Sequence, residues 1–369
     1  MILRRTATRL SARSAALRSA RRCAASSTSA VGPVNVLLGR ELSNHFHLAT
    51  ELFLIEERQP RQPTLFLWRN DKTIVIGRHQ NVWRECDVQK MDRDGVQLSR
   101  RDSGGGAVYQ DLGNTCFTFL SPGGTFDKAR NNAIILNALK NRFGTQGEAS
   151  GRNDLVVDGK KFSGAAFKQL GPVDLHHGTL LLHVDLDGLG RYLTPHKLKL
   201  QSKGVASVAA RVCNLRDLNP EINHQTVCDA LIAEFARSYG ADPDSIQAEE
   251  VTSTSPLTQS QVFQKHLSRL QDWEWRFGSS PQFSHELETR FDWGTFTVHL
   301  DVKGGVVSQC RIFSDCLDAP LIDLLTTSLQ GVKYDPSELY KAALKVADTD
   351  VRESWMKEFG SWIREQVAT

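Results

Sequence analysis

SRRDSGGGAVYQDLGNTCFTF, residues 99–119, carries the clearest structural signal in the chain. Arg100 and Arg101 precede the glycine triplet Gly104–Gly106, and an extended apolar rhythm follows from Thr115 to Leu120. Glycine loses the most backbone freedom on folding and packs no side chain, so a triplet in a strand-like setting is costly. The cost indicates that a ligand approaches the backbone where a Cβ would block it, and the arginines favour an anion. A glycine-rich turn with two solvated arginines is the alternative explanation.

Periodicity predicts the elements on either side of this stretch. A helix is expected over 44–58, with Asn44 as its cap, because its apolar residues lie mostly on one face. Residues 64–70 and 73–78 are predicted to form a β-hairpin around Asn70-Asp71-Lys72. The other elements expected in this part of the chain are helices over 83–94, 127–143 and 224–239, and strands over 96–99, 115–120 and 176–185, the last beginning at two histidines.

A second motif, GRNDLVVDGKKFSG at residues 151–164, is predicted to be a strand, a tight Asp158-Gly159 turn and another strand. Neighbouring side chains in a strand point to opposite faces, so at most one of Lys160 and Lys161 is expected to point inward. Two solvated lysines after a turn are the alternative.

The C-terminal third has a different pattern. Residues 247–261 are polar and Ser/Thr-rich, which is typical of a linker. A hairpin is expected from 290–300 and 304–313, followed by helices over 319–330, 336–347 and 351–367. Strands precede helices in blocks, so the predicted class is α+β. The predicted division is a transit peptide (1–33), a catalytic domain (34–246), a linker and bridging segment (247–282) and a small α+β accessory domain (283–369).

The charge is unevenly distributed. The net charge is +3, but residues 1–40 hold eight arginines and no acid, which leaves 37 basic and 42 acidic residues in the remainder. Bulk charge therefore gives no reason to expect nucleic-acid binding, and no apolar run is long enough to predict a membrane span. An N-terminus rich in Arg, Ser and Ala predicts a mitochondrial transit peptide and a matrix location. The seven cysteines form no C-x-x-C pair, which argues against a zinc site or disulfide framework.

One ligand to consider for these residues is an acyl adenylate. Such a ligand needs cations and backbone N–H donors for its phosphate, and an apolar slot for its acyl chain. The phosphate could be bound by Arg101, Gly104–Gly106 and Lys161. The apolar slot could be formed by the faces of 44–58 and 64–70. Walker A, dinucleotide-binding and G-x-S-x-G patterns are absent from the sequence.

Four ordered motifs resemble the lipoate–protein ligases of the bacterial two-domain A type, which have mitochondrial lipoyltransferase relatives. They are RRDSGGGAVYQDLGNTCFTF (100–119), GRNDLVV (151–157), GKKFSG (159–164) and HHGTLLLHVDL (176–186), and the likeness extends from about 44 to 367 through segments such as KGVASVAARVCNL (203–215). The resemblance implies the biotin/lipoate ligase fold, with mixed sheets and helices, plus a C-terminal accessory domain.

The resemblance also implies a reaction. Lipoate and ATP, with Mg²⁺, would give lipoyl-AMP and pyrophosphate. The lipoyl group would then pass to a lysine of lipoyl domains, in 2-oxoacid dehydrogenase E2 subunits and the glycine-cleavage H protein. The catalytic residue implied is Lys161. The implied ATP and lipoyl-AMP contacts are Arg101, Ser103, Gly104, Gly105, Gly106, Ala107, Val108, Tyr109, Asn153, Asp154 and Lys161. The implied lipoate contacts are Arg101, Gly106, Lys161 and His177, and Asp154 is the candidate near a metal.

The chain departs from the family pattern at Gln110, where a histidine usually follows the aromatic residue. Glutamine forms hydrogen bonds but does not exchange a proton near neutrality, so we expect this position to be only a contact. An ATP-independent lipoyltransferase using lipoyl-AMP or a lipoylated carrier remains the main alternative. An octanoyltransferase with a thioester on Cys116 and a non-catalytic module that binds lipoyl domains are further alternatives. Because Cys116 lies in a predicted buried strand, a small core residue is favoured over a thioester site there.

Overall fold

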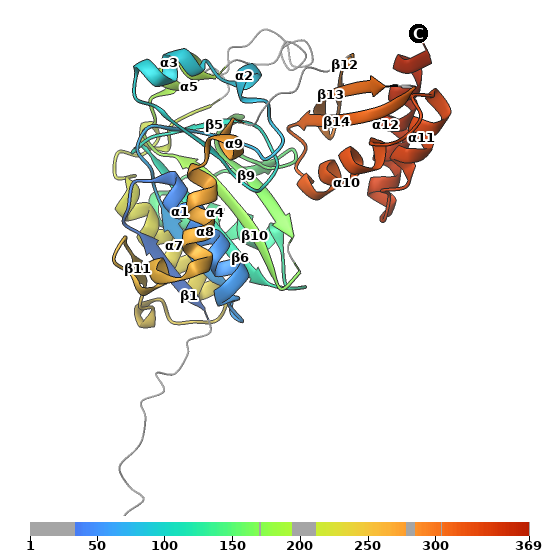
Figure 1. Ribbon diagram of the computed structural model, residues 1–369. Coiled ribbons are helices and arrows are strands. Elements are labelled where there is room, and N and C mark those ends of the chain that lie inside the picture. The colour runs from blue at the N-terminus through green and yellow to red at the C-terminus, as the bar shows by residue number, and fades with distance from the viewer. Residues whose placement is uncertain (1–33, 170, 194–211, 278–284, 304, 369) are drawn as a thin grey trace, which may run out of the picture.

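The structure is a computed structural model that describes residues 34–169, 171–193, 212–277, 285–303 and 305–368. An eight-stranded mixed sheet in the order β11-β1-β2-β6-β10-β9-β8-β7 forms the centre of the larger domain (Figure 1). Its strands are β1 (Asn35–Gly39), β2 (Thr64–Trp68), β6 (Asn114–Pro122), β7 (Glu148–Ser150), β8 (Asp154–Val157), β9 (Lys160–Gln169), β10 (Val173–Leu181) and β11 (Glu249–Val251).

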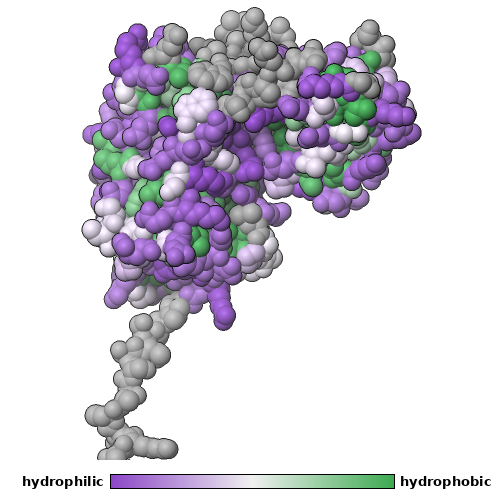
Figure 2. All heavy atoms as spheres, viewed as in Figure 1, coloured by the Kyte–Doolittle hydropathy of each residue, from purple (hydrophilic) through white to green (hydrophobic). Residues whose placement is uncertain are grey.

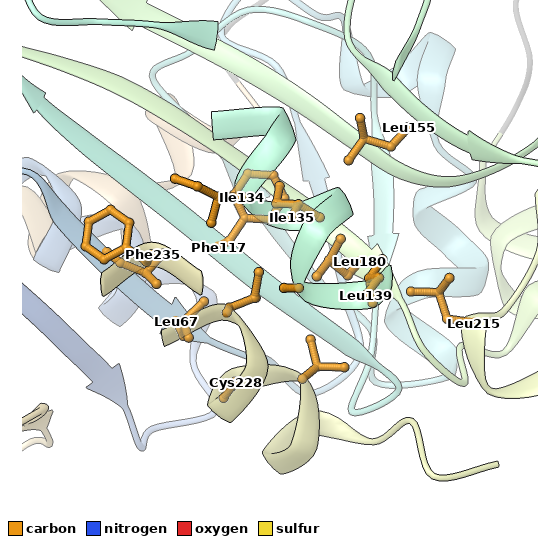
Figure 3. Packing of buried hydrophobic residues seen from close by; sticks show 14 of the residues in the cluster. Leu67, Phe117, Ile134, Ile135, Leu139, Leu155, Leu180, Leu215, Cys228 and Phe235 are labelled. Carbon is orange, nitrogen blue, oxygen red and sulfur yellow. The ribbon is translucent and has the colours of Figure 1, made fainter. Parts of the chain in front are cut away.

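Alternation along the central strands separates two buried faces. In β2 and β6, Leu67 and Phe117 join one core, while Trp68 and Cys116 join the other. Figure 3 shows the first core, in which side chains of α4 (Lys128–Phe143) and α7 (His224–Ser238) gather over β6. The second face is covered by α1 (Asn44–Phe53), which continues as a π-helical turn (Leu54–Arg58), and by α8 (Gln261–Gln271). The cavity described below lies on this second face.

A separate three-stranded sheet carries the glycine-rich loop. Its order is β4 (Gln97–Arg100), β3 (Thr73–Ile76), β5 (Val108–Gln110), with β3 parallel to β4 and antiparallel to β5. The triplet lies in the loop between β4 and β5, and within it Gly105 has a positive φ of 93°. Helices α2 (Val82–Glu85), α3 (Val88–Arg93) and α5 (Leu186–Tyr192) contribute to the small core of this sheet.

The C-terminal domain lies beside the larger one and has its own core (Figure 1). Its elements are β12 (His285–Phe291), β13 (Gly294–Lys303), β14 (Val306–Ser314), α10 (Ala319–Leu329), α11 (Pro336–Leu344) and α12 (Asp350–Ala368). The segment between β14 and α10 contacts the glycine-rich loop, since the backbone N–H of Gly105 donates to the carbonyl of Cys316 at 3.1 Å. Arg78 also pairs with Asp323 at 3.2 Å. The observed architecture confirms the α+β class.

Several predicted elements are wrong in detail. Residues 64–70 and 73–78 do not pair with each other, because β2 belongs to the large sheet and β3 to the small one. The chain passes from one sheet to the other at Asn70. This side chain is fully buried and hydrogen-bonded to His47, so it does not lie in a hairpin turn. The expected helix over 83–94 is two short helices, because Asp87 caps a new one by accepting from the backbone of Lys90. The cap of α1 is Ser43, not Asn44.

The expected linker is also wrong where it is described. Its residues 249–251 form β11, which pairs in parallel with β1, and Phe263 of α8 is buried against the α1 side of the sheet. The two histidines expected at a strand start lie in the middle of β10. The C-terminal hairpin is a three-stranded sheet, because 290–291 belong to β12. Three predicted segments lie outside the described residues. They are the transit peptide (1–33), the first part of the motif KGVASVAARVCNL (203–211), and residues 278–284 of the bridging segment and the start of the accessory domain.

The visible surface is mostly hydrophilic, with apolar colour in scattered patches (Figure 2). Within the described ranges, none of the helices combines the length and the apolar character that crossing a membrane requires.

Candidate functional site

A cavity of about 130 Å³ lies between the α1-covered face of the large sheet and the glycine-rich loop. Strands β2, β5, β9 and β10, helix α1 and the loop all contribute side chains to its wall. Its lining residues are Asn44, Leu48, Trp68, Val75, Arg101, Gly105, Gly106, Ala107, Val108, Gln110, Asn153, Lys161, Gly164, Ala165, Ala166, His177, Gly178 and Thr179. Cationic, amide and apolar groups therefore line one volume.

Lys161 is the lysine that faces the cavity, whereas Lys160 is exposed. Its Nζ lies 2.8 Å from Oδ1 of Asp154, and both side chains are 34% exposed. A Cβ at Gly164 would lie 2.7 Å from this Nζ, so the missing side chain makes room for the ammonium. Asn153 lies beside the pair and donates from Nδ2 to the carbonyl of Ala165 at 2.6 Å. The Asp158-Gly159 turn is as predicted, with positive φ at both residues.

Arg101 organises the loop from within. Its guanidinium donates to the carbonyls of Val75 at 3.1 Å, Gly104 at 2.7 Å and Gly106 at 2.9 Å, and Nε donates to Oγ of Ser103 at 3.1 Å. Burial lowers the pKa of Arg101 to about 10, which leaves it charged at neutral pH. In this structure the arginine therefore shapes the loop, and its predicted contact with a nucleotide remains a prediction.

A buried polar chain links the loop to α1. His177 Nδ1 lies 3.0 Å from both carboxylate oxygens of Glu51, and its Nε2 lies 2.7 Å from Oγ of Ser103. A neutral imidazole then donates to Glu51 and accepts from Ser103, whose oxygen accepts from Arg101. Thr118 also donates to Glu51, at 2.5 Å. The negative charge of Glu51 is thus connected to the positive charge of Arg101 through two neutral side chains.

The opposite wall combines apolar and amide groups. Leu48 and Trp68 supply apolar surface, as expected from the faces of 44–58 and 64–70, and Val75 and Val108 add to it from β3 and β5. Oε1 of Gln110 accepts from Nδ2 of Asn44 at 3.3 Å and also from Nδ2 of Asn70. Gln110 is thus held by two amides of the protein, and its contact with a ligand remains a prediction.

Some predicted site residues do not line the cavity. Within the loop, Ser103 and Gly104 face away from the cavity, Ser103 toward His177 and Gly104 toward Cys316. Asp154 is also absent from the lining and contacts it through Lys161. Tyr109 is on the far side of β5, where its ring stacks on Tyr192 with centroids 5.9 Å apart. Alternation along β5 accounts for this, since Val108 and Gln110 face the cavity and Tyr109 faces away.

Sequence reasoning missed several important residues. Glu51 lies in a helix whose apolar pattern gave no reason to single out one glutamate, although a fully buried carboxylate needs partners. Asn44 was interpreted only as a helix cap. Cys116, by contrast, is the buried core residue that was favoured over a thioester site, and burial raises the pKa of its thiol. In the described part of the chain, no cluster of three or more metal-ligating side chains occurs.

Comparison with known proteins accounts for this combination of cavity and loop. Residues 43–236 match the Lipoyl protein ligase A/B catalytic domain, and residues 280–363 match the Bacterial lipoate protein ligase C-terminus. The chain is 50% identical to the lipoate-protein ligase A of Psychrobacter cryohalolentis over 297 residues, which cover 80% of this chain and 87% of that protein. The chain belongs to the lipoate–protein ligase family. It is also 43% identical to the lipoate-protein ligase A of Blochmanniella pennsylvanica over 82% of this chain and 89% of that protein.

Solved structures of lipoate–protein ligases share the fold. A crystal structure of P. falciparum LipL1 in complex with lipoate has 35% identity and a TM-score of 0.81, covering 90% of this chain and 99% of that one. A lipoate-protein ligase A bound with ATP has 26% identity and a TM-score of 0.56, covering 67% of this chain and 98% of that one. The predicted family and the biotin/lipoate ligase-like fold are therefore confirmed.

Proposed function

We propose that this chain is an ATP-dependent lipoate–protein ligase. The carboxylate of lipoate attacks the α-phosphorus of ATP, forming lipoyl-AMP and releasing pyrophosphate. The ε-amine of an acceptor lysine then attacks the acyl carbon, and AMP leaves with the electron pair of the broken acyl–phosphate bond. Family membership, the named relatives and the lipoate- and ATP-bound homologous structures support this assignment.

The observation that carries the proposal is the placement of Lys161. Its ammonium lies over Gly164 at the wall of the cavity and is oriented by Asp154. A fixed cation stabilises the charge that develops when a carboxylate attacks a phosphate, and it needs little reorganisation during the reaction. The apolar wall opposite is suited to the acyl chain.

Mg²⁺ is part of the proposal. Magnesium usually arrives on nucleotide phosphates and is completed by one or two protein carboxylates, where it neutralises phosphate charge. Asp154 fits this limited role because Lys161 engages one of its oxygens, Oδ1, and leaves Oδ2 for a second ligand. Asp154 orients the lysine, and it would hold the ion at the edge of the cavity rather than inside it.

Lipoyl domains are the acceptor class expected of the family. One homologous structure contains a bi-partite lipoate protein ligase and its E2 lipoyl domain from Thermoplasma acidophilum, with 26% identity and a TM-score of 0.58, covering 69% of this chain and 99% of that one. We propose E2 lipoyl domains and the glycine-cleavage H protein as the acceptors here. Incubation of each purified acceptor with the chain, ATP and lipoate, followed by intact-mass measurement, tests each acceptor separately.

A mitochondrial matrix location follows from the basic, acid-free N-terminus and is also a proposal. A fluorescent protein fused behind residues 1–40 should accumulate in mitochondria. The same fusion with its arginines replaced by glutamine should remain outside them, and equal distribution of the two fusions would contradict the proposal.

Lipoate-dependent exchange of pyrophosphate into ATP is the direct test of the activity. The full chain should catalyse exchange only when lipoate and Mg²⁺ are both present. A chain that transfers lipoyl from synthetic lipoyl-AMP without supporting exchange would instead be the ATP-independent lipoyltransferase. Binding of a lipoyl domain without either activity would favour the non-catalytic module.

A further inference from the structure

We propose that Asn44 and Gln110 form a polar subsite that binds the sulfur-bearing end of the acyl group and selects it over a plain hydrocarbon chain. The inference rests on the proposed lipoate substrate, but it concerns a feature that the proposed reaction does not require. An apolar slot alone would accept a saturated chain of similar length equally well.

The first observation is an unpaired acceptor. Asn44 has 0% exposure and lines the cavity, and within the described part of the chain its Oδ1 has no hydrogen-bond partner. A buried carbonyl oxygen without a donor is destabilising, so its retention in a cavity wall indicates a ligand that brings one.

The second observation is the orientation of Gln110. His47 donates from Nδ1 to Oδ1 of Asn70 at 2.9 Å, and Nδ2 of Asn70 donates to Oε1 of Gln110. Nδ2 of Asn44 donates to the same oxygen at 3.3 Å. Because the oxygen of Gln110 already accepts two bonds, the atom that this side chain can offer to a ligand is the donor Nε2. A donor and an acceptor therefore lie side by side in the wall.

The third observation is the position of this pair relative to Lys161. Gly164, Thr179, Cys116 and Trp68 are neighbours in register across β9, β10, β6 and β2. Lys161 lies over Gly164 at one end of this row, and Trp68 is at the other end, two residues before Asn70, which donates to Gln110. Three interstrand spacings of ~4.8 Å separate the ends by about 14 Å. An extended medium-chain acyl group with its carboxyl end at Lys161 can run along this row to Trp68, and Asn44 and Gln110 line the same cavity.

Sulfur chemistry fits this donor and acceptor. A disulfide or thiol sulfur is a weak acceptor for Nε2 of Gln110, and the S–H of an opened dithiol is a donor for Oδ1 of Asn44. The terminal methyl group of octanoate can form neither bond and leaves both amide atoms unpaired. A site built to hydrogen-bond one substrate discriminates against an analogue that lacks the polar group.

Titration calorimetry of the full chain with lipoate, dihydrolipoate and octanoate tests the subsite without requiring catalysis. We expect lipoate to bind roughly tenfold more tightly than octanoate. Gln110→Leu should bring the lipoate-to-octanoate ratio close to one, and Asn44→Leu should selectively weaken binding of the dithiol. Gln110→His should retain most of the preference, because an imidazole can accept with one nitrogen and donate with the other.

The ratio of lipoate to octanoate affinity is measured on one protein sample. A loss of folded protein therefore affects both ligands equally and leaves the ratio unchanged. Equal affinity of the wild-type chain for lipoate and octanoate, or an unchanged ratio in Gln110→Leu, would overturn the subsite. Preferential binding of lipoate by a chain that shows no pyrophosphate exchange would overturn the proposed function and leave the subsite standing.

Discussion

Glu51 accepts a hydrogen bond from Nδ1 of His177 through a carboxylate whose two oxygens both lie 3.0 Å away. The pair fixes which nitrogen of His177 carries the proton, because Nδ1 must donate to a carboxylate that has no proton of its own. Nε2 is then an acceptor toward Ser103, and the Ser103 oxygen remains available to Arg101. Glu51 on α1 is thereby connected, through His177 and Ser103, to Arg101 of the glycine-rich loop, which lies 50 residues later in the sequence.

Glu51→Gln should destabilise the chain by about 2 kcal/mol or more, because it weakens charge-assisted hydrogen bonds and removes a negative charge that favours the charged form of buried Arg101. Urea unfolding at pH 7 measures this free energy. Thr118→Ser is the matched control, since it keeps the hydroxyl that donates to Glu51 and accepts from Nε1 of Trp68, and leaves the Glu51–His177 contact in place. An equal loss of stability in the two variants would show that His177 is not held by the carboxylate charge.

Lys161→Ala should lower the rate of lipoate-dependent pyrophosphate exchange by roughly a hundredfold to a thousandfold or more, because one preorganised charge donor is worth about 3–4 kcal/mol. Lys160→Ala is the control, since the neighbouring lysine is exposed and outside the cavity. A loss of less than tenfold for Lys161→Ala is incompatible with the role assigned to it.

Gly106→Ala should fold like the wild-type chain and bind lipoate and ATP poorly. A Cβ at Gly106 meets no atom within 4 Å, although the residue lines the cavity, so the added methyl group occupies ligand space. Gly104→Ala makes the opposite change, because its Cβ would lie 2.1 Å from the Cys316 carbonyl at the contact between domains. Calorimetric binding and thermal unfolding of both variants separate the two effects, and normal ligand binding by Gly106→Ala would remove the loop from the binding site.

His176→Phe should make the chain less sensitive to acid. His176 is buried beside Phe117, Phe119 and Phe167, and burial lowers its pKa to about 3. Between that value and the ordinary pKa of about 6.5, the unfolded chain takes up a proton that the folded chain does not, so stability falls as pH falls through this window.

The size of this effect can be measured from urea unfolding at pH 6.5 and pH 5. The variant should lose about 2 kcal/mol less stability than the wild-type chain between these two values. His285→Phe provides the comparison, because His285 is exposed and lies at the end of β12 in the other domain. Identical pH profiles for His176→Phe and wild type would show that His176 is not neutral in the folded chain.

Local patterns predicted much of the fold and of the cavity. The Asp158-Gly159 turn depends on two adjacent positive φ values, which this dipeptide favours, and alternation predicted that at most one of Lys160 and Lys161 points inward, while the choice of Lys161 came from the family resemblance. The pairing of β2 and β3 could not be predicted, because the turn-like residues 70–72 do not reveal that Asn70 enters a buried amide network. The role of Glu51 was hidden for the same reason, since its partners come from β6 and β10.

The placement of β11 and α8 determines where a fragment that contains the catalytic domain can end. β11 covers the open edge of β1, Phe263 of α8 packs against the α1 side, and Arg269 of α8 pairs with Asp102, next to the glycine-rich loop, at 2.6 Å. A fragment ending at residue 246 would expose a β-strand edge and an apolar helix face, both of which promote aggregation. A fragment that continues to Phe277 keeps these contacts and is the shorter piece suited to soluble expression, crystallisation and fusion to a different C-terminal domain.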